Sequence, residues 1–271
     1  MDIISVFQLG FMQRALIASV IVAVLCAIWG IFVVLRKQAY LSDAVAHASL
    51  TGIAIGILLG WSYLPLALLA GITLAIAITY LKKHSNLADD TLIGIIYTFM
   101  FAIGIILLSL FPGYRPDLFS YLFGSLLSVT WADIIVNIVV LIISALIMMI
   151  FYRKLLYVAF DAEAASIRGI NTNLYEYLIN IAISIATIVA IKSVGIVMVA
   201  ALLLVPAASA KLISKSFKQM FPNAIIISLL ASLIGIISSY YLNTPSGATI
   251  VVVATMLFFM VFGYSKITTK H

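Results

Sequence analysis

Residues 15–35 read ALIASVIVAVLCAIWGIFVVL and contain no charged side chain. A membrane-spanning helix needs about 20 mostly apolar residues to cross the hydrocarbon core of a bilayer. This stretch is therefore long enough to span a membrane, and it decides the class of fold. The whole chain has the same character, because 65% of its 271 residues are hydrophobic and 9% are charged, against about 25% charged in soluble domains. A soluble globular domain and a disordered chain are both excluded.

The chain divides into nine apolar segments of similar length. They cover residues 13–35, 42–60, 64–81, 92–111, 132–152, 174–191, 195–212, 223–242 and 248–264. Their apolar runs are continuous rather than alternating, which excludes the strands of a transmembrane β-barrel. We predict an all-α polytopic membrane protein with eight or nine transmembrane helices in a single domain over residues 1–271. The lower number applies if the two segments that meet at Lys192 and Ser193 form one broken helix.

The basic residues predict which loops face the cytoplasm. When the loops between nine spans are assigned to alternate sides, twelve basic residues fall on one side and three on the other. The twelve are Arg36, Lys37, Lys82, Lys83, Arg153, Lys154, Arg168, Lys211, Lys215, Lys218, Lys266 and Lys270, and the three are Arg14, Arg115 and Lys192. The N-terminus is therefore predicted to lie outside and the C-terminus in the cytoplasm.

Two connections are longer than a simple turn. The outer one ends in an apolar piece, residues 118–129, that is too short to span and is predicted to be interfacial or re-entrant. The inner one, residues 153–173, contains a predicted short helix over 161–169. Asp161 can cap its first N–H groups and Gly169 suits a left-handed C-terminal position. This helix either docks against a partner or lies free at the membrane surface.

The sequence lacks the common catalytic motifs. It has no G-x-x-x-x-G-K-[ST] phosphate loop, no G-x-S-x-G elbow and no H-E-x-x-H pair. Its single cysteine, Cys26, lies in an apolar run and is predicted to be a small buried residue. We therefore expect no ATPase or protease activity from this chain alone, and the positive-inside bias accounts for the net charge of +6 without a nucleic-acid partner.

Asp43 and His47 form the most informative polar pair. They are four residues apart, so on a helix they lie on one face, which Thr51 continues. A carboxylate and a neutral imidazole are ligands for Zn²⁺, Mn²⁺ or Fe²⁺, and ionisable groups in apolar spans usually face a cavity or a partner. The alternative is that Asp43 only contributes charge at a helix start while His47 lies at the membrane interface.

Two further features concern helix packing. Small residues recur every fourth position and allow close approach of another helix, either within the chain or in a second copy; they are Ala44, Ala48, Gly52, Gly56 and Gly60. Pro206 interrupts the hydrogen-bond ladder of the seventh segment. It is predicted to produce a structural kink, with a hinge as the alternative.

Several of these stretches together resemble the permeases of bacterial metal-ion ABC importers, the zinc, manganese and iron uptake family. The resemblance rests on VVLR (33–36), DAVAHA (43–48) and TGIAIG (51–56). It continues in DTLIGI (90–95), LFGSLL (122–127) and VGIVMVAALLLVPAA (194–208). These stretches occur in order along almost the whole chain, which makes the resemblance specific.

The resemblance implies a function and a set of partners. A homodimer in the bacterial plasma membrane would pair with cytoplasmic ATP-binding subunits and an extracytoplasmic metal-binding protein. It would import zinc, manganese or ferrous iron by alternating access, and it would hold no permanent cofactor. Asp43 and His47 would line the path and bind the passing ion. The helix that couples ATP hydrolysis to transport would carry Asp161, Glu163, Ala164, Ala165 and Gly169.

Two questions stay open at this point. An ion-coupled secondary transporter could use Asp43 and His47 as a proton relay, and a structural membrane subunit could use them only at a helix start. In addition, Asp43 lies near the predicted cytoplasmic end of its span, whereas an ion site would lie deeper. A re-entrant or unwound stretch between Lys37 and Ser42 would remove this conflict, since irregular backbone is tolerated where it lines a cavity.

Overall fold

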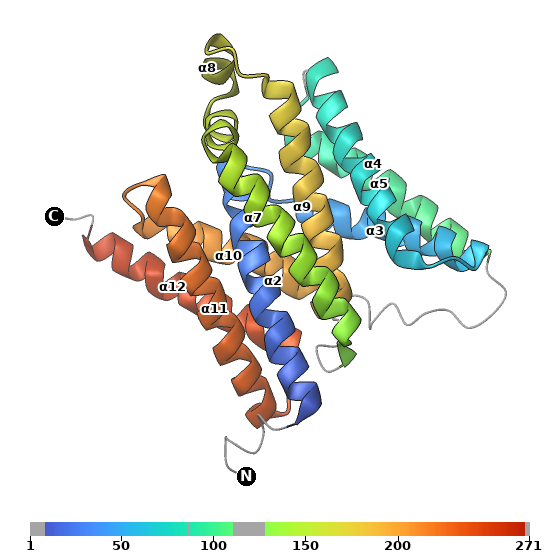
Figure 1. Cartoon of the computed structure of the whole chain (residues 1–271), viewed down its shortest axis with the longest axis vertical. Helices are drawn as coiled ribbons and strands as arrows, with labels where there is room; N and C mark the ends of the chain where they lie inside the picture. The colour runs from blue at the N-terminus through green and yellow to red at the C-terminus, as the bar shows by residue number, and fades with distance from the viewer. Residues whose placement is uncertain (1–8, 86, 111–127, 269–271) are drawn as a thin grey trace. The chain divides into compact units, whose positions relative to one another are not determined.

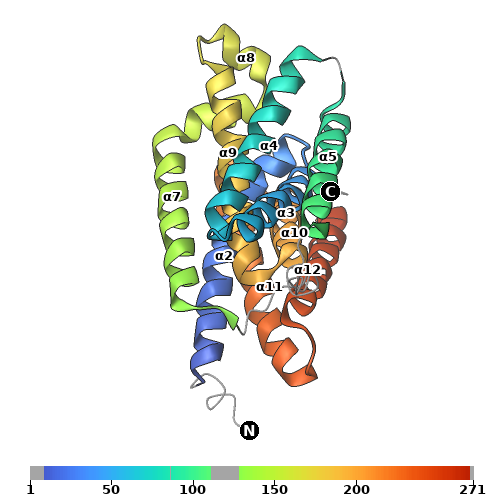
Figure 2. The same cartoon turned by 90° about the vertical axis from the view of Figure 1, so that its right-hand side faces the viewer.

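The computed structural model describes residues 9–85, 87–110 and 128–268, and these residues are almost entirely helical (Figures 1 and 2). The helices are α2 (Gly10–Leu35), α3 (Leu41–Leu59), α4 (Tyr63–His84), α5 (Asp89–Ser109), α7 (Trp131–Phe160), α8 (Ala162–Ile167), α9 (Thr172–Val194), α10 (Ile196–Ile213), α11 (Phe217–Leu242) and α12 (Ser246–Thr268). Within the described residues, nine of them are long and apolar enough to cross a membrane. The predicted all-α polytopic fold is confirmed, and the described part of the chain supplies nine candidate spans.

The structure corrects two details of the predicted elements and leaves a third untested. α7 continues through Phe160 rather than ending at residue 152, which shortens the inner connection. α11 begins at Phe217 rather than at residue 223, so Pro222 lies within its early turns. The apolar piece 118–129 lies outside the described residues except for its last two positions. Hydropathy located the apolar centres of these helices but not the polar turns that extend them.

The segments that meet near Lys192 are two helices. α9 runs through Lys192 to Val194, and α10 starts at Ile196. Gly195 separates them with φ 87° and ψ 163°, a conformation that glycine tolerates because it has no Cβ. One glycine is thus enough to end one span and begin the next.

The chain forms two compact units. The first comprises Met1–Val34, Leu118–Ser144 and Ala190–His271, and its described part contains α2, α10, α11 and α12. The second comprises Leu35–Asp117 and Ala145–Val189, with α3, α4, α5 and α8. α7 and α9 contribute a part to each unit. The single domain predicted over residues 1–271 stays a prediction.

In the first unit, polar contacts between helices secure an otherwise apolar core. The indole Nε1 of fully buried Trp29 on α2 donates to Ser144 Oγ on α7 at 2.9 Å. Ser228 Oγ on α11 donates to the Ala23 carbonyl of α2 at 2.9 Å. Such hydrogen bonds matter among apolar spans because lipid tails are as apolar as the helices. Burial of apolar surface alone therefore does not favour one helix–helix contact over another.

In the second unit, α3 packs against both α4 and α5 (Figure 1). A Cβ on Gly52 would lie 2.2 Å from the Leu66 carbonyl oxygen of α4, so a larger residue would force these two helices apart. This unit contains Asp43, His47 and the short helix α8.

Candidate functional site

Asp43 and His47 lie in the first half of α3. The helix begins at Leu41 after a non-helical connection, residues 36–40, in which Lys37 has a φ of 56°. Asp43 lies in the first turn, where the helix dipole favours a carboxylate. Asp43 and His47 are half-buried, whereas every other residue from 41 to 52 is buried. The pair therefore occupies the one face of this stretch that the chain leaves partly open.

A hydrogen bond determines which nitrogen of His47 is free to bind a ligand. His47 Nδ1 lies 2.7 Å from the Asp43 carbonyl oxygen. A carbonyl oxygen can only accept, so Nδ1 of the neutral ring carries the proton and Nε2 keeps its lone pair. Metal-binding histidines commonly fix their tautomer in this way.

Two aromatic rings of α5 orient the His47 imidazole. The Tyr97 ring lies 5.4 Å from it, centroid to centroid, at 55°. The Phe101 ring lies 4.8 Å away in an edge-to-face arrangement at 79°. Tyr97 and Phe101 are four residues apart and so share one face of α5. The sequence did not predict either ring. The only indication is the four-residue spacing of two aromatic residues on a helix that packs against the helix with Asp43 and His47.

The contact between α3 and α5 is held further along by Thr51. Its hydroxyl donates to the Met100 carbonyl, so the residue that continues the Asp43–His47 face is used for packing. A Cβ on Gly104 would lie 3.1 Å from the Thr51 nitrogen, closer than an ordinary contact. α5 is therefore positioned to hold its rings against His47.

The described residues contain no group of three or more His, Cys, Asp or Glu side chains that could hold a metal ion. Asp43 and His47 thus offer two ligands, one oxygen and one nitrogen. Zn²⁺ takes four ligands in most protein sites, and Mn²⁺ often has six. Within these residues, one copy of the chain does not complete a coordination shell.

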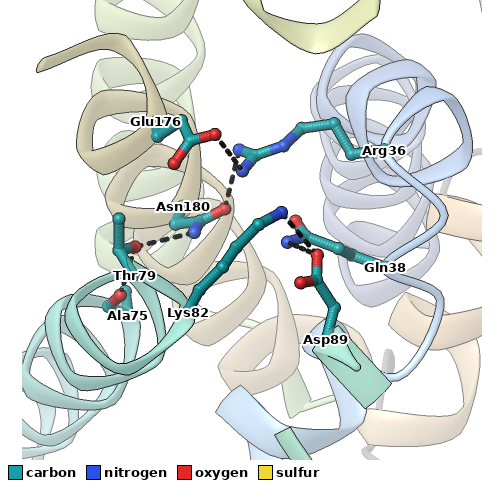
Figure 3. Close-up of polar contacts among 8 residues, drawn as sticks. All are labelled: Arg36, Gln38, Ala75, Thr79, Lys82, Asp89, Glu176 and Asn180. Atoms are coloured by element: carbon teal, nitrogen blue, oxygen red, sulfur yellow. Dashed lines mark hydrogen bonds and ion pairs between the residues drawn. The ribbon is translucent and has the colours of Figure 1, made fainter. Parts of the chain in front are cut away.

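A polar network that the sequence reasoning missed surrounds Arg36 (Figure 3). The sequence predicts Arg36 to be a cytoplasmic loop charge, but its side chain is only 4% exposed. Nη1 donates to Asn180 Oδ1 of α9 at 3.0 Å, and Nη2 lies 3.8 Å from Glu176 Oε1. Asn180 Nδ2 donates in turn to Thr79 Oγ1 of α4 at 2.8 Å. Burial lowers the pKa of Arg36, while Glu176 and Asp89 oppose that shift.

The same connection is tied to α5 by a second group of contacts. Gln38 Nε2 donates to Asp89 Oδ2 at 3.2 Å, and Lys82 Nζ forms an ion pair with the same oxygen at 2.6 Å. The network thus joins the α2–α3 connection to α4, α5 and α9, just before the turn that carries Asp43. The sequence signal was weak: Glu176 and Asn180 are polar positions four residues apart at the start of an apolar span.

α8 forms as the sequence predicts for the inner connection. Asp161 Oδ1 accepts from the Ala164 N–H at 2.9 Å and caps the helix. At the other end, Gly169 has a φ of 75°, its N–H bonds the Ser166 carbonyl, and the Ile170 N–H bonds the Ala165 carbonyl. This pair of bonds is a Schellman motif.

α8 has little contact with its own unit. Ala165 is buried, whereas Glu163 and Ala164 are exposed and the Ile167 side chain is 86% exposed. Figures 1 and 2 show α8 beyond the ends of α7 and α9. A helix that is capped at both ends and displayed in this way is suited to contact another molecule.

Four of the remaining predicted residues pack within the chain, and two do not follow that pattern. Ala44 and Ala48 are fully buried, and Gly52 and Gly56 face α4 of the same chain. Gly60 departs from the predicted packing stripe, because it is the left-handed C-cap of α3 and a Cβ there would meet nothing within 4 Å. Pro206 is buried and α10 runs through it, so its hinge role stays a prediction.

Comparison with known proteins gives concordant matches over nearly the whole chain. The model of the ABC 3 transport family matches residues 8–265. The manganese transport system membrane protein MntC of Listeria innocua is 36% identical over 255 residues, which cover 94% of this chain and 91% of that protein. A probable iron transport system membrane protein of Haemophilus influenzae is 34% identical over 270 residues, 97% of each chain.

A solved structure agrees with these matches. PsaBC from Streptococcus pneumoniae, in complex with Fab, contains a chain that superposes with a TM-score of 0.84 at 33% identity. The match covers 96% of this chain and 94% of that one. Sequence and fold therefore point to the same group of membrane proteins.

Proposed function

This chain belongs to the ABC 3 transport family, and from that premise we propose that it imports manganese or ferrous iron as the membrane permease of an ATP-driven transporter. Family membership makes it an ABC permease component and argues against the ion-coupled secondary transporter. The choice of cargo rests on the relatives that are named for manganese and iron transport. The observation that supports a divalent-ion site is the half-buried Asp43 carboxylate four residues before His47, whose Nε2 keeps its lone pair in the neutral ring. Mn²⁺ and Fe²⁺ accept these ligand types.

The site requires a second copy of the chain. One copy contributes one carboxylate and one imidazole, and two copies that face each other supply two of each. Four such ligands are enough to hold a divalent ion between the copies while water or backbone oxygens fill the remaining positions. Binding must stay weak enough to release the ion, which fits a set assembled only when the two faces meet.

The energy comes from a partner. ATP-binding subunits dock on α8, whose exposed Glu163, Ala164 and Ile167 form the contact, and their closure moves α8. An extracytoplasmic metal-binding protein delivers the ion when the path is open to the outside. The path then opens to the cytoplasm and the ion leaves, in a cycle of alternating access across the bacterial plasma membrane.

The test is uptake of Mn²⁺, Fe²⁺ and Zn²⁺ into vesicles that contain the complete transporter with its ATP-binding and metal-binding partners. Asp43→Asn and His47→Gln are expected to reduce uptake at least about 10-fold, since even groups that only orient metal ligands matter to that degree. Uptake of Zn²⁺ alone would overturn the choice of cargo, and unchanged uptake by both variants would overturn the site.

The chain supplies a matched control for each substitution. His84 bonds the carbonyl four residues before it through Nδ1 at 2.8 Å, as His47 does, but it is exposed at the end of α4. Asp90 lies in the first turn of α5, as Asp43 does in α3, and is exposed. His84→Gln and Asp90→Asn are expected to keep wild-type uptake.

A further inference from the structure

Arg36 and Glu176 form a buried ion pair that is not closed. Their side chains are 4% and 12% exposed, yet Nη2 and Oε1 are 3.8 Å apart, whereas charged hydrogen bonds are about 2.7–2.9 Å long. Arg36 Nη2 has no hydrogen-bond partner among the described residues, and neither does the buried Gln38 Oε1. Buried polar groups are normally satisfied. A shift of about 1 Å between α9 and the α2–α3 connection would satisfy the guanidinium.

Glu176 is joined to α8 by a short, hydrogen-bonded connection. Only residues 168–171 separate α8 from α9. The Ile170 N–H bonds back to the Ala165 carbonyl at 3.1 Å, and Asn171 Oδ1 accepts from the Leu174 N–H at 3.2 Å. Glu176 is the fifth residue of α9. A displacement of α8 is therefore transmitted to Glu176 through a connection that is too short and too well hydrogen-bonded to absorb it.

Arg36 is joined as directly to the helix that carries Asp43. It opens the connection 36–40, and the Leu41 N–H bonds the Gln38 carbonyl at 3.1 Å where α3 begins. Asp43 follows in the first turn of that helix. A displacement of Arg36 is thus transmitted to the start of α3. All of these residues belong to one compact unit.

We propose that the Arg36–Glu176 pair is the link between α8 and α3, loose in the conformation described here and tight in the other conformation of the transport cycle. Both are positioning residues that do not touch the ion. This inference rests on the proposed function, because it takes α8 as the docking helix and Asp43 with His47 as the ion site. The simpler reading is that the pair only stabilises the fold.

A double-mutant design separates the two readings. Arg36→Met and Glu176→Leu each leave one buried charge without its ion-pair partner, whereas replacing both members of a buried pair by apolar residues of similar volume is often harmless to stability. Two quantities are measured on the complete transporter. They are the midpoint temperature of thermal unfolding and the ratio of metal imported to ATP hydrolysed. Each single variant is expected to lower the midpoint and to lower the ratio about tenfold, a size typical of coupling between two sites.

The double variant decides the question. We expect it to recover the wild-type midpoint while its transport ratio stays about tenfold low, because the coupling through the pair is still lost. A ratio that recovers together with the midpoint would overturn the proposal, and so would an unchanged ratio in the single variants. Lys83→Gln is the control, because exposed Lys83 also bridges α4 and α9, 4.8 Å from the Tyr177 ring centre; it should keep the wild-type ratio.

A second readout does not depend on the cargo. Spin labels at Ser166→Cys on α8 and Leu59→Cys at the end of α3, both exposed, are placed in a Cys26→Ser background, which removes the single natural cysteine. Trapping the complete transporter with ATP and vanadate should shift the distance between the labels, and Glu176→Gln should abolish the shift. An absent shift in the wild type, or a shift that survives Glu176→Gln, would overturn the link. Failure of metal uptake alone would overturn only the proposed function.

Discussion

Two ion pairs along α9 differ in how completely they are satisfied. Near its start, Glu176 lies 3.8 Å from Arg36 and both are almost fully buried. Near its end, Lys192 Nζ lies 2.8 Å from Asp133 Oδ1, with side chains 31% and 11% exposed. The second pair is tight and has a partly exposed lysine, whereas the first is loose and its arginine is almost fully buried.

The surroundings of Asp133 reinforce the contrast. Asp133 Oδ2 accepts from the Thr130 N–H at 3.1 Å, and the Asp133 N–H bonds Thr130 Oγ1 at 3.3 Å. These reciprocal bonds form a capping box at the start of α7. The Lys192–Asp133 pair therefore serves as a static clamp between α9 and α7. The Arg36–Glu176 pair, in contrast, retains unsatisfied groups that a movement can satisfy.

The largest expected effect is that of Glu176→Ala. It leaves the buried Arg36 guanidinium without its ion-pair partner, which is expected to reduce the free energy of unfolding by about 3–5 kcal/mol. SDS titration of the purified protein in detergent measures the change. A loss of unfolding free energy as small as that of an exposed ion pair would show that Arg36 reaches water in solution. The difference between the Arg36–Glu176 and Lys192–Asp133 pairs would then not hold.

Asp133→Ala is expected to have a smaller effect of about 2 kcal/mol, most of it from the lost cap of α7. Lys192 is partly exposed, so its charge is not stranded when the carboxylate is removed. The same SDS titration provides the comparison. If Asp133→Ala reduced the free energy of unfolding as much as Glu176→Ala does, the Lys192–Asp133 pair would depend on burial as strongly as the Arg36–Glu176 pair.

Asp161→Ala tests the helix at the far end of the proposed link. The Asp161 carboxylate accepts from the Ala164 N–H, and loss of such a cap costs about 1 kcal/mol. The effect should be local, so hydrogen exchange at residues 164–167 should accelerate several-fold while α9 stays protected. Equal acceleration along α9 would mean that α8 and α9 unfold as one unit.

The smallest effect is expected from salt. Ion pairs with exposed members contribute about 0–1 kcal/mol and are screened by added salt. Raising the salt concentration to 1 M should therefore remove the effect of Lys192→Met on stability and leave the effect of Glu176→Gln almost unchanged. Identical salt responses of the two variants would contradict the assignment of one pair to the solvated class.

The sequence was most informative where a rule is local. Nine apolar runs predicted eight or nine spans, because each span must satisfy its backbone hydrogen bonds within itself, and the described residues contain nine candidates. Asp161 and Gly169 predicted both ends of α8, since a cap depends on residues only a few positions away. The boundaries at Phe160 and Phe217 were missed because polar helical turns carry no hydropathy signal.

The candidate site was predicted only in part. Asp43 and His47 followed from their spacing on one helix. Tyr97 and Phe101 did not, because their role depends on how α5 packs against α3. Arg36 was assigned to the membrane surface, since counting loop charges cannot distinguish a solvated arginine from one buried beside Glu176.

By itself, the sequence determined that this protein is an all-helical membrane protein with a polar pair on its second span and a capped helix in a connection. These properties follow from residue type and spacing within single segments. Only the tertiary structure decided that the His47 imidazole lies against two aromatic rings of α5 and that Arg36 is buried against α9. Both depend on distances between segments far apart in the chain, and those distances arise only when the helices pack.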